Sequence, residues 1–480
     1  MTRLVGLDVG TTSVKGIAID QTGAVVHVAE RGYPLSTPRP GWSEQDPELW
    51  WKAAAEVLDE CEADRALGIG LSGQMHGLVT LDADDRPLRP AILWNDGRTQ
   101  KQCVEIEERV GRERLIELTG NRALAGFTAP KLLWLREEEP ETYARIRSIL
   151  LPKDYVRLRL CEEHAIDVAD ASGTLLFDVA RRRWSGEVLD ALEIDPAWLP
   201  GVAESPEVAG ETHGGVPVAA GAGDQAAGAL GVGVVAEGGP ASVVLGTSGV
   251  VFAALDRYAA DPEGRVHAFC HAVPGVWHVM GVMLSAAGSL RWLRDTIGGD
   301  VSYDDLIAGA GRWEPGVEGL LFAPYLAGER TPYPDPEARG AFLGLGLRHD
   351  RGAMTRAVLE GVAFGLRDAL DLVVEMGGRP ASGRVSGGGG RGMLWLEIVA
   401  SVLGIPLELT RADEGAAYGA ALLGGVAAGV WMDVPEAVEA CVRVVRTVEP
   451  RADWVERYAA LRPCYDALYP GLHGIQHAAD

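Results

Sequence analysis

Two segments half a chain apart repeat one pattern of residues. They read LDVGTTSVKGIAID over residues 7–20 and VVLGTSGVVFAALD over residues 243–256. Each is predicted to form an apolar strand, a Gly-Thr turn and a second apolar strand, and Gly10-Thr11 aligns with Gly246-Thr247. The N–H groups and hydroxyls of such a turn form a concave nest for phosphate oxygens. We therefore expect two related lobes that hold the phosphates of a nucleotide between them.

The order of secondary structure is also predicted to repeat. Strands are expected over residues 3–8, 14–19, 24–30, 216–222, 242–255 and 276–282, and near Leu71 and Val385. Helices are expected over residues 46–62, 98–118, 128–148, 285–297 and 353–376, with Asp46 and Thr128 as N-caps. This alternation indicates two α/β domains of common ancestry. We place their boundary in the glycine-rich stretch 232–240, which gives domains over residues 1–236 and 237–480.

Length and composition exclude several classes of function. A chain of 480 residues is too long for one ordinary core. It has 44 Lys and Arg against 68 Asp and Glu, a formal net charge of −24, which disfavours nucleic acid and anionic membranes as partners. The first residues show no leader pattern, no apolar run could span a bilayer, and the six cysteines have neither metal-site nor redox spacing. We expect a cytoplasmic protein.

Two aspartates stand where strands are predicted to end. Asp8 precedes the first Gly-Thr turn, where its carboxylate would hold Mg²⁺ beside bound phosphates or only satisfy N–H groups of the turn. Asp224 lies in GAGDQ, where it is either a helix N-cap or a general base that accepts a proton from a sugar hydroxyl. We expect Gly221 and Gly223 to clear space for a substrate, which favours the catalytic role of Asp224.

Two loops carry the mixture of side chains that suits a polyol. In SGQMHG, Gln74 and His76 can hydrogen-bond hydroxyls, and Met75 can lie against the apolar face of a sugar. LWNDGRT offers Trp94 and Asp96 in a turn. A lone histidine is more often structural than ligand-binding, and Asn-Asp-Gly is also an ordinary turn. Both interpretations stay open for each loop.

Candidate nucleotide contacts gather in three turns. They are Gly10, Thr11, Thr12 and Lys15 in the first repeat, Gly246, Thr247 and Ser248 in the second, and Gly388 and Gly389 in GGGGRG. Lys15 either reaches a phosphate or is a solvated strand residue. Residues 387–392 also satisfy the dinucleotide pattern G-x-G-x-x-G, with Glu408 as its acid, so a nicotinamide-dependent oxidoreductase is a rival. Residues 68–73 satisfy the same pattern without a following helix, and the rival leaves the repeated turns unexplained.

Taken together, these motifs resemble the FGGY family of carbohydrate kinases, within the actin–hexokinase superfamily of two-lobed ATPases. The resemblance covers GLDVGTTSVKG, SGQMHG, GFTAPKLLWLREE, GAGDQ, LGTSG, YLAGERTPYPDP, GAFLGLGLRHD, RAVLEGVAFGLRD and GGGGRG, between Leu4 and about Val430. It departs from the family pattern at Ala353, where a polar residue is usual, and at Glu397, where Gln or Arg is frequent. The implied fold is α/β, with two related actin/hexokinase-type (ribonuclease H-like) lobes and an interdomain cleft.

The resemblance also implies an activity, which is ATP-dependent phosphorylation of D-xylulose at its 5-hydroxyl. It implies that the sugar lies against Met75, His76 and Asp224, that the ATP phosphates lie between the two turns, and that adenosine lies on the second lobe. Asp224 would be the general base, and Asp8 and Asp224 would help to place Mg²⁺. A family member for another ketose or polyol and a nucleotide-gated sugar sensor without catalysis stay open. The sequence does not decide whether the chain forms a homodimer.

Overall fold

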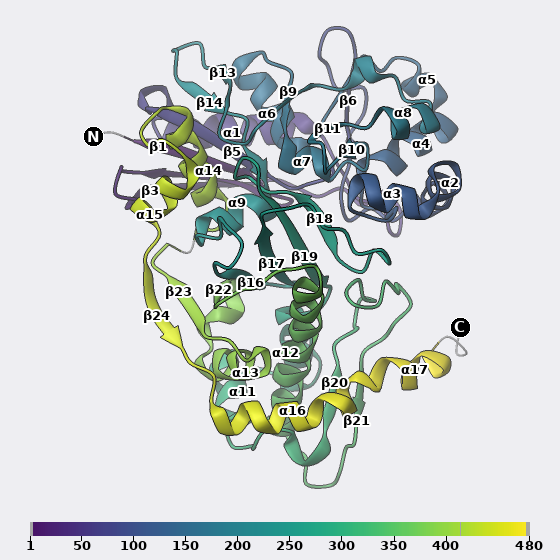
Figure 1. Cartoon of the computed structure of the whole chain (residues 1–480), viewed down its shortest axis with the longest axis vertical. Coiled ribbons are helices and arrows are strands. Elements are labelled where there is room, and N and C mark those ends of the chain that lie inside the picture. The colour runs from purple at the N-terminus through teal and green to yellow at the C-terminus, as the bar shows by residue number, and fades with distance from the viewer. Residues whose placement is uncertain (1–2, 413, 477–480) are drawn as a thin grey trace.

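The computed structural model describes residues 3–412 and 414–476, and its elements form two lobes that each contain a seven-stranded sheet (Figure 1). The first sheet has the order β13-β14-β5-β1-β2-β3, with β15 beside β5. The second has the order β18-β19-β17-β16-β22-β23-β24. Their strands are β1 (Leu4–Val9), β2 (Ser13–Ile19), β3 (Val25–Gly32), β5 (Gly68–Gly73), β13 (Val208–Glu211), β14 (Pro217–Ala219), β15 (Ala222–Gly223), β16 (Ala241–Leu245), β17 (Gly249–Leu255), β18 (His267–Cys270), β19 (Trp277–Met283), β22 (Gly383–Ser386), β23 (Leu407–Thr410) and β24 (Val444–Val448).

The two sheets share one pairing scheme. In the first, β1 pairs antiparallel with β2 and parallel with β5, and β14 runs parallel to β5. In the second, β16 pairs antiparallel with β17 and parallel with β22, and β23 runs parallel to β22. Each Gly-Thr turn therefore joins the two strands of the central hairpin in its lobe. The expectation of two related α/β lobes, each built on one copy of the sequence repeat, is confirmed.

Short strand pairs and helices complete the lobes. The short strands are β4 (Glu44–Gln45), β6 (Val79–Leu81), β7 (Ala91–Ile92), β8 (Ser148–Leu150), β9 (Ala165–Asp167), β10 (Phe177–Asp178), β11 (Arg183–Trp184), β12 (Gly201–Ala203), β20 (Leu321–Ala323) and β21 (Ala341–Leu343). The helices are α1 (Pro47–Glu60), α2 (Gln100–Val110), α3 (Arg112–Thr119), α4 (Thr128–Glu138), α5 (Pro140–Tyr143), α6 (Pro152–Cys161), α7 (Val168–Ser172), α8 (Gly186–Leu192), α9 (Asp224–Gly231), α10 (Ala287–Leu293), α11 (Tyr303–Ala310), α12 (Arg351–Glu375), α13 (Met393–Leu403), α14 (Ala416–Ala427), α15 (Val434–Cys441), α16 (Ala452–Asp466) and α17 (Leu468–Gln476).

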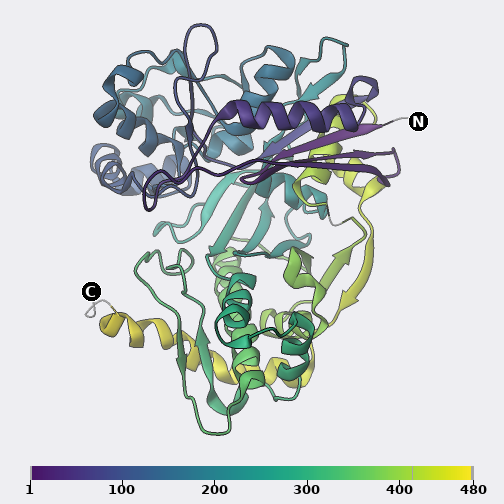
Figure 2. The same cartoon turned by 180° about the vertical axis from the view of Figure 1, so that it is seen from behind.

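Helices cover the sheets in matching positions. The dark purple helix α1 packs on β2 and β3 of the first sheet, as Figure 2 shows from behind. The long helix α12 packs on β17 and β19 of the second. Asp350 caps α12 by accepting a hydrogen bond from the N–H of Ala353, so the apolar residue at position 353 costs the helix no cap. None of the described helices is long and apolar enough to cross a membrane.

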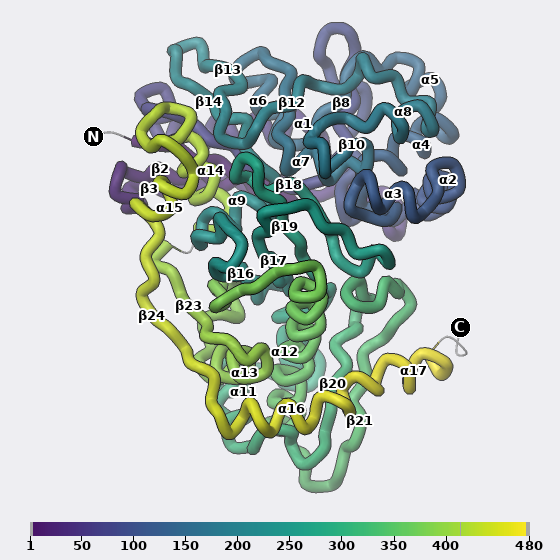
Figure 3. Tube along the Cα trace, in the orientation of Figure 1, coloured from purple at the N-terminus to yellow at the C-terminus, as the bar shows by residue number. Residues whose placement is uncertain are grey.

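Helix α14, late in the chain, packs on the sheet of the first lobe. It contacts β1, β5 and α9, and the chain trace shows it beside the purple first strands (Figure 3). Its approach requires glycine in the sheet, because a Cβ on Gly70 would lie 1.7 Å from the carbonyl oxygen of Ala420 and a Cβ on Gly6 would lie 2.0 Å from that of Ala417. The contact between helices α9 and α14 therefore links the two halves of the chain. The domain boundary near residue 236 stays a prediction.

Two of the predicted helices are wrong in detail. The helix expected over residues 98–118 is split into α2 and α3 at Gly111, whose φ of +85° ends the first helix. The helix expected over residues 128–148 ends at Glu138, and the chain continues through α5 to β8. Thr128 is the first residue of α4 and not its cap, because its hydroxyl donates to the carbonyl oxygen of His76. Asp46 is the N-cap of α1, as predicted.

Candidate active site

Both Gly-Thr turns are held through their carbonyl oxygens. In the first turn, the carbonyl oxygen of Gly10 accepts from the Tyr33 hydroxyl at 2.6 Å, and that of Thr11 accepts from the side-chain amide of Gln45 at 2.7 Å. In the second turn, the carbonyl oxygens of Gly246 and Thr247 accept from N–H groups at the start of α10, each at 2.8 Å.

The N–H groups of these turns are free of protein acceptors. No described residue accepts a hydrogen bond from the N–H groups of Thr11 and Thr12 in the first turn, or of Thr247 and Ser248 in the second. Main-chain N–H groups left free at a tight turn are the donors that bind phosphate oxygens. Each lobe thus presents one set of such donors.

Two carboxylates lie at the ends of two strands that flank β5 and run parallel to it. Strand β5 lies between β1 and β15, and its Ser72 is in register with Asp8 on one side and with Ala222 on the other. The Ser72 hydroxyl donates to Asp8 at 3.0 Å, and Asp224 follows directly after β15 as the first residue of α9. The carboxyl ends of parallel strands lie at one edge of the sheet, so Asp8 and Asp224 lie at the same edge.

Burial raises the pKa of both acids, and the charge of Asp8 raises that of Asp224 further. Burial raises the pKa of Asp8 to about 6, although the Ser72 hydrogen bond and the charge of Lys15 lower it. Burial, and after it the charge of Asp8, raise the pKa of Asp224 to about 7 against the hydrogen bonds from Gln225. A buried carboxyl group with its pKa raised by a like charge is a frequent feature of catalytic sites.

The structural role considered for Asp224 does not apply. Gly223 occupies the N-cap position of α9, and no side chain makes a capping hydrogen bond there. The expectation that Gly221 and Gly223 clear space for a substrate is wrong as well. A Cβ on Gly223 would lie 2.7 Å from Cγ of Met75, and one on Gly221 would lie 2.3 Å from the carbonyl oxygen of Leu71. The protein's own packing requires these glycines, because the main chain of β5 lies against Gly221 and the side chain of Met75 lies against Gly223.

A pocket of about 240 Å³ opens beside Asp224 and receives residues from both lobes. We call it the Asp224 pocket. Its lining from the first lobe is Met75, His76, Trp94, Leu124, Gly126, Phe127, Asp224 and Gln225, and from the second it is Ser248, Val250, Met280, Val282 and Arg330. Apolar and aromatic walls with a few polar groups are typical of a site for a small polar molecule that has an apolar face.

His76 is fixed as a neutral hydrogen-bonding group in this pocket. Its backbone is left-handed, with φ of +69°, and its carbonyl oxygen accepts from Nζ of the buried Lys131 at 2.8 Å. Its Nδ1 lies 2.6 Å from the carbonyl oxygen of Gly173, and only a protonated Nδ1 can donate to a carbonyl. Burial lowers the pKa of His76 to about 3, so the ring is neutral and its Nε2 is an acceptor.

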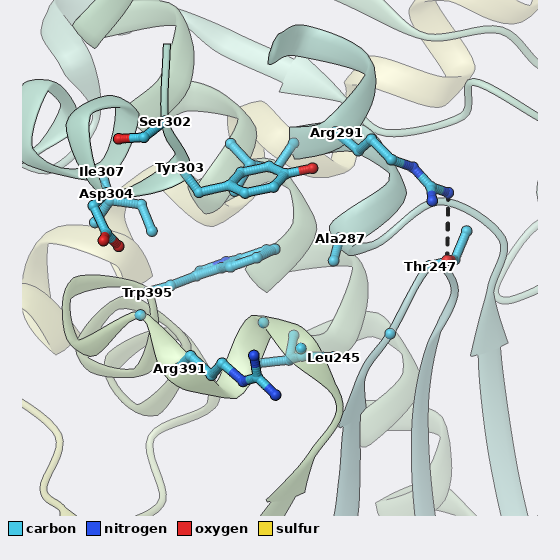
Figure 4. Close-up of a pocket in the computed structure, with 15 residues that line it drawn as sticks. Leu245, Thr247, Ala287, Arg291, Ser302, Tyr303, Asp304, Ile307, Arg391 and Trp395 are labelled. Carbon is cyan, nitrogen blue, oxygen red and sulfur yellow. Dashed lines mark hydrogen bonds between the residues drawn. The ribbon is translucent and has the colours of Figure 1, made fainter. Parts of the chain in front are cut away.

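A larger pocket of about 730 Å³ lies in the second lobe and is drawn in Figure 4. We call it the Trp395 pocket. The ring of Trp395 lies below that of Tyr303, and Arg291 at the other end donates to the Thr247 hydroxyl at 3.4 Å. Gly246, Thr247, Gly388 and Gly389 also line it, and a Cβ added to Gly388 would meet open space. Aromatic rings at one end and a phosphate-type turn at the other fit the base and the phosphates of a nucleotide.

The second turn joins the two pockets. Thr247 lines the Trp395 pocket, and its neighbour Ser248 lines the Asp224 pocket. The terminal phosphate of a nucleotide bound in the Trp395 pocket would therefore lie next to the Asp224 pocket. This is the arrangement that transfer between two bound molecules requires.

Comparison with known proteins agrees with this geometry. The N-terminal domain model of the FGGY family of carbohydrate kinases matches residues 3–231, and the C-terminal domain model matches residues 241–428. The chain belongs to the FGGY family of carbohydrate kinases. Its function class is therefore that of a phosphotransferase with an alcohol group as acceptor, which uses ATP and a small-molecule sugar.

Individual relatives of this FGGY kinase cover nearly all of it. The xylulose kinase of Escherichia coli (strain K12) is 44% identical over 88% of this chain and 90% of its own length. The xylulose kinase of Lactococcus lactis subsp. lactis is 38% identical over 99% of this chain and 98% of its own length. The crystal structure of xylulose kinase from Rhodospirillum rubrum aligns with a TM-score of 0.92 at 31% identity, covering 99% of this chain and 100% of that one. The predicted actin/hexokinase-type fold is confirmed.

The structure of this FGGY kinase separates the predicted site residues into three groups. Met75, His76, Trp94, Asp224 and Ser248 line the Asp224 pocket, and Gly246, Thr247, Gly388 and Gly389 line the Trp395 pocket. Asp8, Gly10, Thr11, Thr12, Lys15, Gln74 and Asp96 line neither of them. Of these last, Asp8 acts on Asp224 through its charge, and Gly10, Thr11 and Thr12 form the first turn.

The remaining three residues contact other parts of the protein. The side-chain amide of Gln74 donates to the carbonyl oxygen of Gly10 at 3.2 Å, so it supports the first turn. Asp96 is 2% exposed and accepts from the N–H of Ser43 at 2.6 Å and from Arg98. Lys15 forms an ion pair with Glu414. Their assignment to substrate and phosphate stays a prediction.

Several pocket residues are absent from the sequence-based set. Phe127 and Arg330 line the Asp224 pocket, and Tyr303, Arg291 and Trp395 line the Trp395 pocket. Phe127 and Arg330 lie inside motifs that carry the family resemblance, which is a usable signal, and Trp395 lies three residues after GGGGRG. Tyr303 and Arg291 lie outside any such motif, and only the packing of α10 and α11 brings them to the pocket.

The dinucleotide-binding alternative requires Glu408 to bind a ribose, and the structure engages Glu408 elsewhere. Glu408 lies on β23 and accepts a hydrogen bond from Arg384 of β22 at 3.0 Å, so its carboxylate joins two strands. Residues 388–391 form a short 3₁₀ turn before α13. An acid engaged in this way does not present its oxygens to a ribose.

Proposed function

We propose that the chain is a xylulokinase, which transfers the γ-phosphoryl group of ATP to the 5-hydroxyl of D-xylulose. The observation that carries the proposal is Asp224, a half-buried acid with a pKa raised to about 7 that lines a small pocket next to the second turn. A base is most effective when its pKa lies near the working pH, because enough of it is ionised and it still binds a proton well. The names and coverage of the relatives support D-xylulose as the acceptor.

The proposed chemistry needs one proton acceptor and fixed phosphate donors. The ionised Asp224 carboxylate accepts the proton of the sugar hydroxyl while the hydroxyl oxygen bonds to the γ-phosphorus. The bond between this phosphorus and the bridging oxygen breaks, and ADP leaves. The free N–H groups of the two turns hold the phosphate oxygens in line, and this positioning supplies most of the catalysis in phosphoryl transfer. His76 accepts a hydrogen bond from a sugar hydroxyl through Nε2.

The two acids fit a magnesium ion. Asp8 and Asp224 offer carboxylate oxygens, and the charge of Asp8 raises the pKa of Asp224, so a cation between them would relieve a repulsion. The described residues hold no cluster of three or more candidate metal ligands. Binding by only one or two carboxylates is the usual pattern for Mg²⁺ in kinases, because the ion keeps water and phosphate oxygens as most of its ligands. Bound Mg²⁺ would offset negative charge on the phosphates.

We expect the two lobes to close around the bound sugar. Ser248 and Val250 of the second lobe line the Asp224 pocket together with Met75 and Asp224 of the first. Movement of the lobes toward one another on sugar binding would expel water, which otherwise competes with the sugar as phosphoryl acceptor.

A coupled assay of ADP release tests the proposal. D-xylulose, D-ribulose, L-xylulose, glycerol and gluconate are compared at saturating ATP and Mg²⁺, and D-xylulose is expected to have the highest kcat/KM. A higher kcat/KM for another compound of the panel would make that compound the proposed substrate. No turnover with any of them would contradict the proposed function. ATP or ADP with Mg²⁺ is expected to raise the melting temperature, whereas NAD is expected to leave it unchanged.

A further inference from the structure

Arg330 is the residue of the Asp224 pocket that the chemistry above leaves unused. It lies in the loop between β20 and β21 of the second lobe, and it is the only Lys or Arg among the described residues that line this pocket. It is half-buried. No described residue forms a hydrogen bond or an ion pair with its guanidinium group. Withdrawing a guanidinium from water without a partner costs free energy, so a ligand that pairs with it is expected.

The backbone on either side of Arg330 is fastened to the sheet. On one side, Glu329 accepts from the N–H of Leu284 at 3.0 Å and from the N–H of Arg330 at 2.7 Å. On the other, the Thr331 hydroxyl accepts from the N–H of Val282 at 3.0 Å, and the Thr331 N–H donates to the carbonyl oxygen of Val282 at 3.0 Å. An unpaired guanidinium group on a hydrogen-bonded backbone is typical of a preorganised binding residue.

The pocket has two electrostatic ends. The charge of Arg330 contributes to lowering the pKa of His76 and of His267, whereas the charge of Asp8 acts on Asp224. Arg330 therefore belongs to the His76 end of the pocket and Asp224 to the Asp8 end. The nearest acid to Arg330 along the chain, Glu329, acts on the guanidinium through its charge, but its carboxylate accepts from backbone N–H groups and forms no ion pair with Arg330.

We propose that Arg330 binds the carbonyl end of the sugar and makes the site selective for a 2-ketose over a polyol. This inference rests on the proposed function, which puts the 5-hydroxyl at Asp224 and so directs C1 and C2 toward the opposite end of the pocket. A guanidinium only donates hydrogen bonds, in a planar fork, and the carbonyl oxygen at C2 with the neighbouring oxygen at C1 forms an adjacent pair of acceptors. Reduction of the carbonyl to an alcohol removes the planar acceptor that the fork matches.

Substitution of Arg330 by Gln, and by Lys as the conservative change, tests this role. R330Q is expected to raise the KM for D-xylulose about 10- to 100-fold with the KM for ATP unchanged, and R330K is expected to fall between R330Q and the unsubstituted protein. The inhibition constant of xylitol, which lacks the carbonyl, is expected to change by less than about threefold. The matched control is R348Q in the same lobe, because Arg348 is 79% exposed and pairs only with Glu318.

Other results of the Arg330 substitutions would contradict the inference or a part of it. An unchanged KM for D-xylulose in R330Q, or a fall in kcat or a rise in the KM for ATP with the sugar KM unchanged, would overturn it. Equal weakening of D-xylulose and xylitol would overturn the part that concerns the carbonyl. An ADP-induced rise in melting temperature, retained in R330Q and R330K, shows that the Trp395 pocket is intact. If the unsubstituted protein uses none of the five sugars, the proposed function fails; if it uses D-xylulose and R330Q keeps its KM, only this inference fails.

Discussion

The negative charge of Asp8 adds to burial in raising the pKa of Asp224 to about 7. The two residues are 216 positions apart in sequence numbering. Ser72, on the strand between them, is in register with Asp8 and with Ala222, which lies two residues before Asp224. The coupling has a functional consequence, because the base becomes sensitive to any change at its neighbour. It also has a cost, because two like charges share a buried site.

Removal of the proposed base is expected to lower turnover without weakening binding. Asp224→Asn keeps the size of the side chain but cannot accept the proton, so kcat is expected to fall about 10²- to 10⁴-fold with the KM for the sugar largely retained. Steady-state kinetics of ADP release measure both. Asp190→Asn, at an exposed aspartate of α8, is the control. Turnover that is unaltered in Asp224→Asn would remove Asp224 from the mechanism.

The pH dependence is expected to follow the ionisation of Asp224. Its carboxylate is protonated below about pH 7, so kcat/KM for the sugar is expected to rise about tenfold per pH unit up to that value and then level off. Asp8→Asn removes the repelling charge, so it is expected to move this limb to lower pH. A limb that stays in place in Asp8→Asn would contradict the coupling, whatever the loss of rate.

Stability is expected to change in the opposite direction to activity. The pKa of Asp224 is raised to about 7 in the folded protein from an ordinary 3.8, so the folded state binds the proton more tightly and ionisation destabilises it. Asp224→Asn is therefore expected to raise the melting temperature at pH 8 by about 2–4 °C. The gain shrinks as pH falls below 7 and disappears near the ordinary pKa. Calorimetry of both proteins at pH 8 and pH 5 measures it, and an equal gain at both values would contradict the assignment.

Substitution of His76 separates a role in sugar binding from a structural role. His76→Ala removes the ring and its Nε2 acceptor, so the KM for the sugar is expected to rise about tenfold or more while the KM for ATP stays constant. The left-handed backbone makes His76→Asn the matched variant, because Asn tolerates that conformation. A similar rise for both substrates in the two variants would make His76 a structural residue.

Neighbouring glycines of the Trp395 pocket are expected to respond differently to a side chain. A Cβ on Gly388 meets open space in the pocket, so Gly388→Val is expected to raise the KM for ATP and leave the melting temperature unchanged. A Cβ on Gly389 would lie 2.8 Å from Cβ of Leu245, so Gly389→Ala is expected to destabilise the protein by about 1–3 kcal/mol. Thermal unfolding and ATP titration separate the two effects, and the reverse assignment would show that the nucleotide lies elsewhere.

Features made by neighbours in the chain could be predicted, and features made by packing could not. Asp46 was recognisable as a cap because its partner lies two residues away, at Glu48. Gly111 lies in a segment with helical character on both sides, and its positive φ ends α2 where one continuous helix was expected. The space beside Gly223 was assigned to a substrate, although Met75, from the loop that follows β5, fills it.

The amino-acid sequence by itself determined the two lobes, the pair of phosphate-type turns and the acids next to them, because strands and tight turns depend on residues close together in the chain. Only the tertiary structure decided that Asp8 acts on Asp224, that α14 packs on the first sheet, and that Arg330 enters a pocket built mainly by the other lobe. The physical reason is that pKa shifts, pocket shape and unpaired charge arise from burial, and burial joins groups that are hundreds of residues apart.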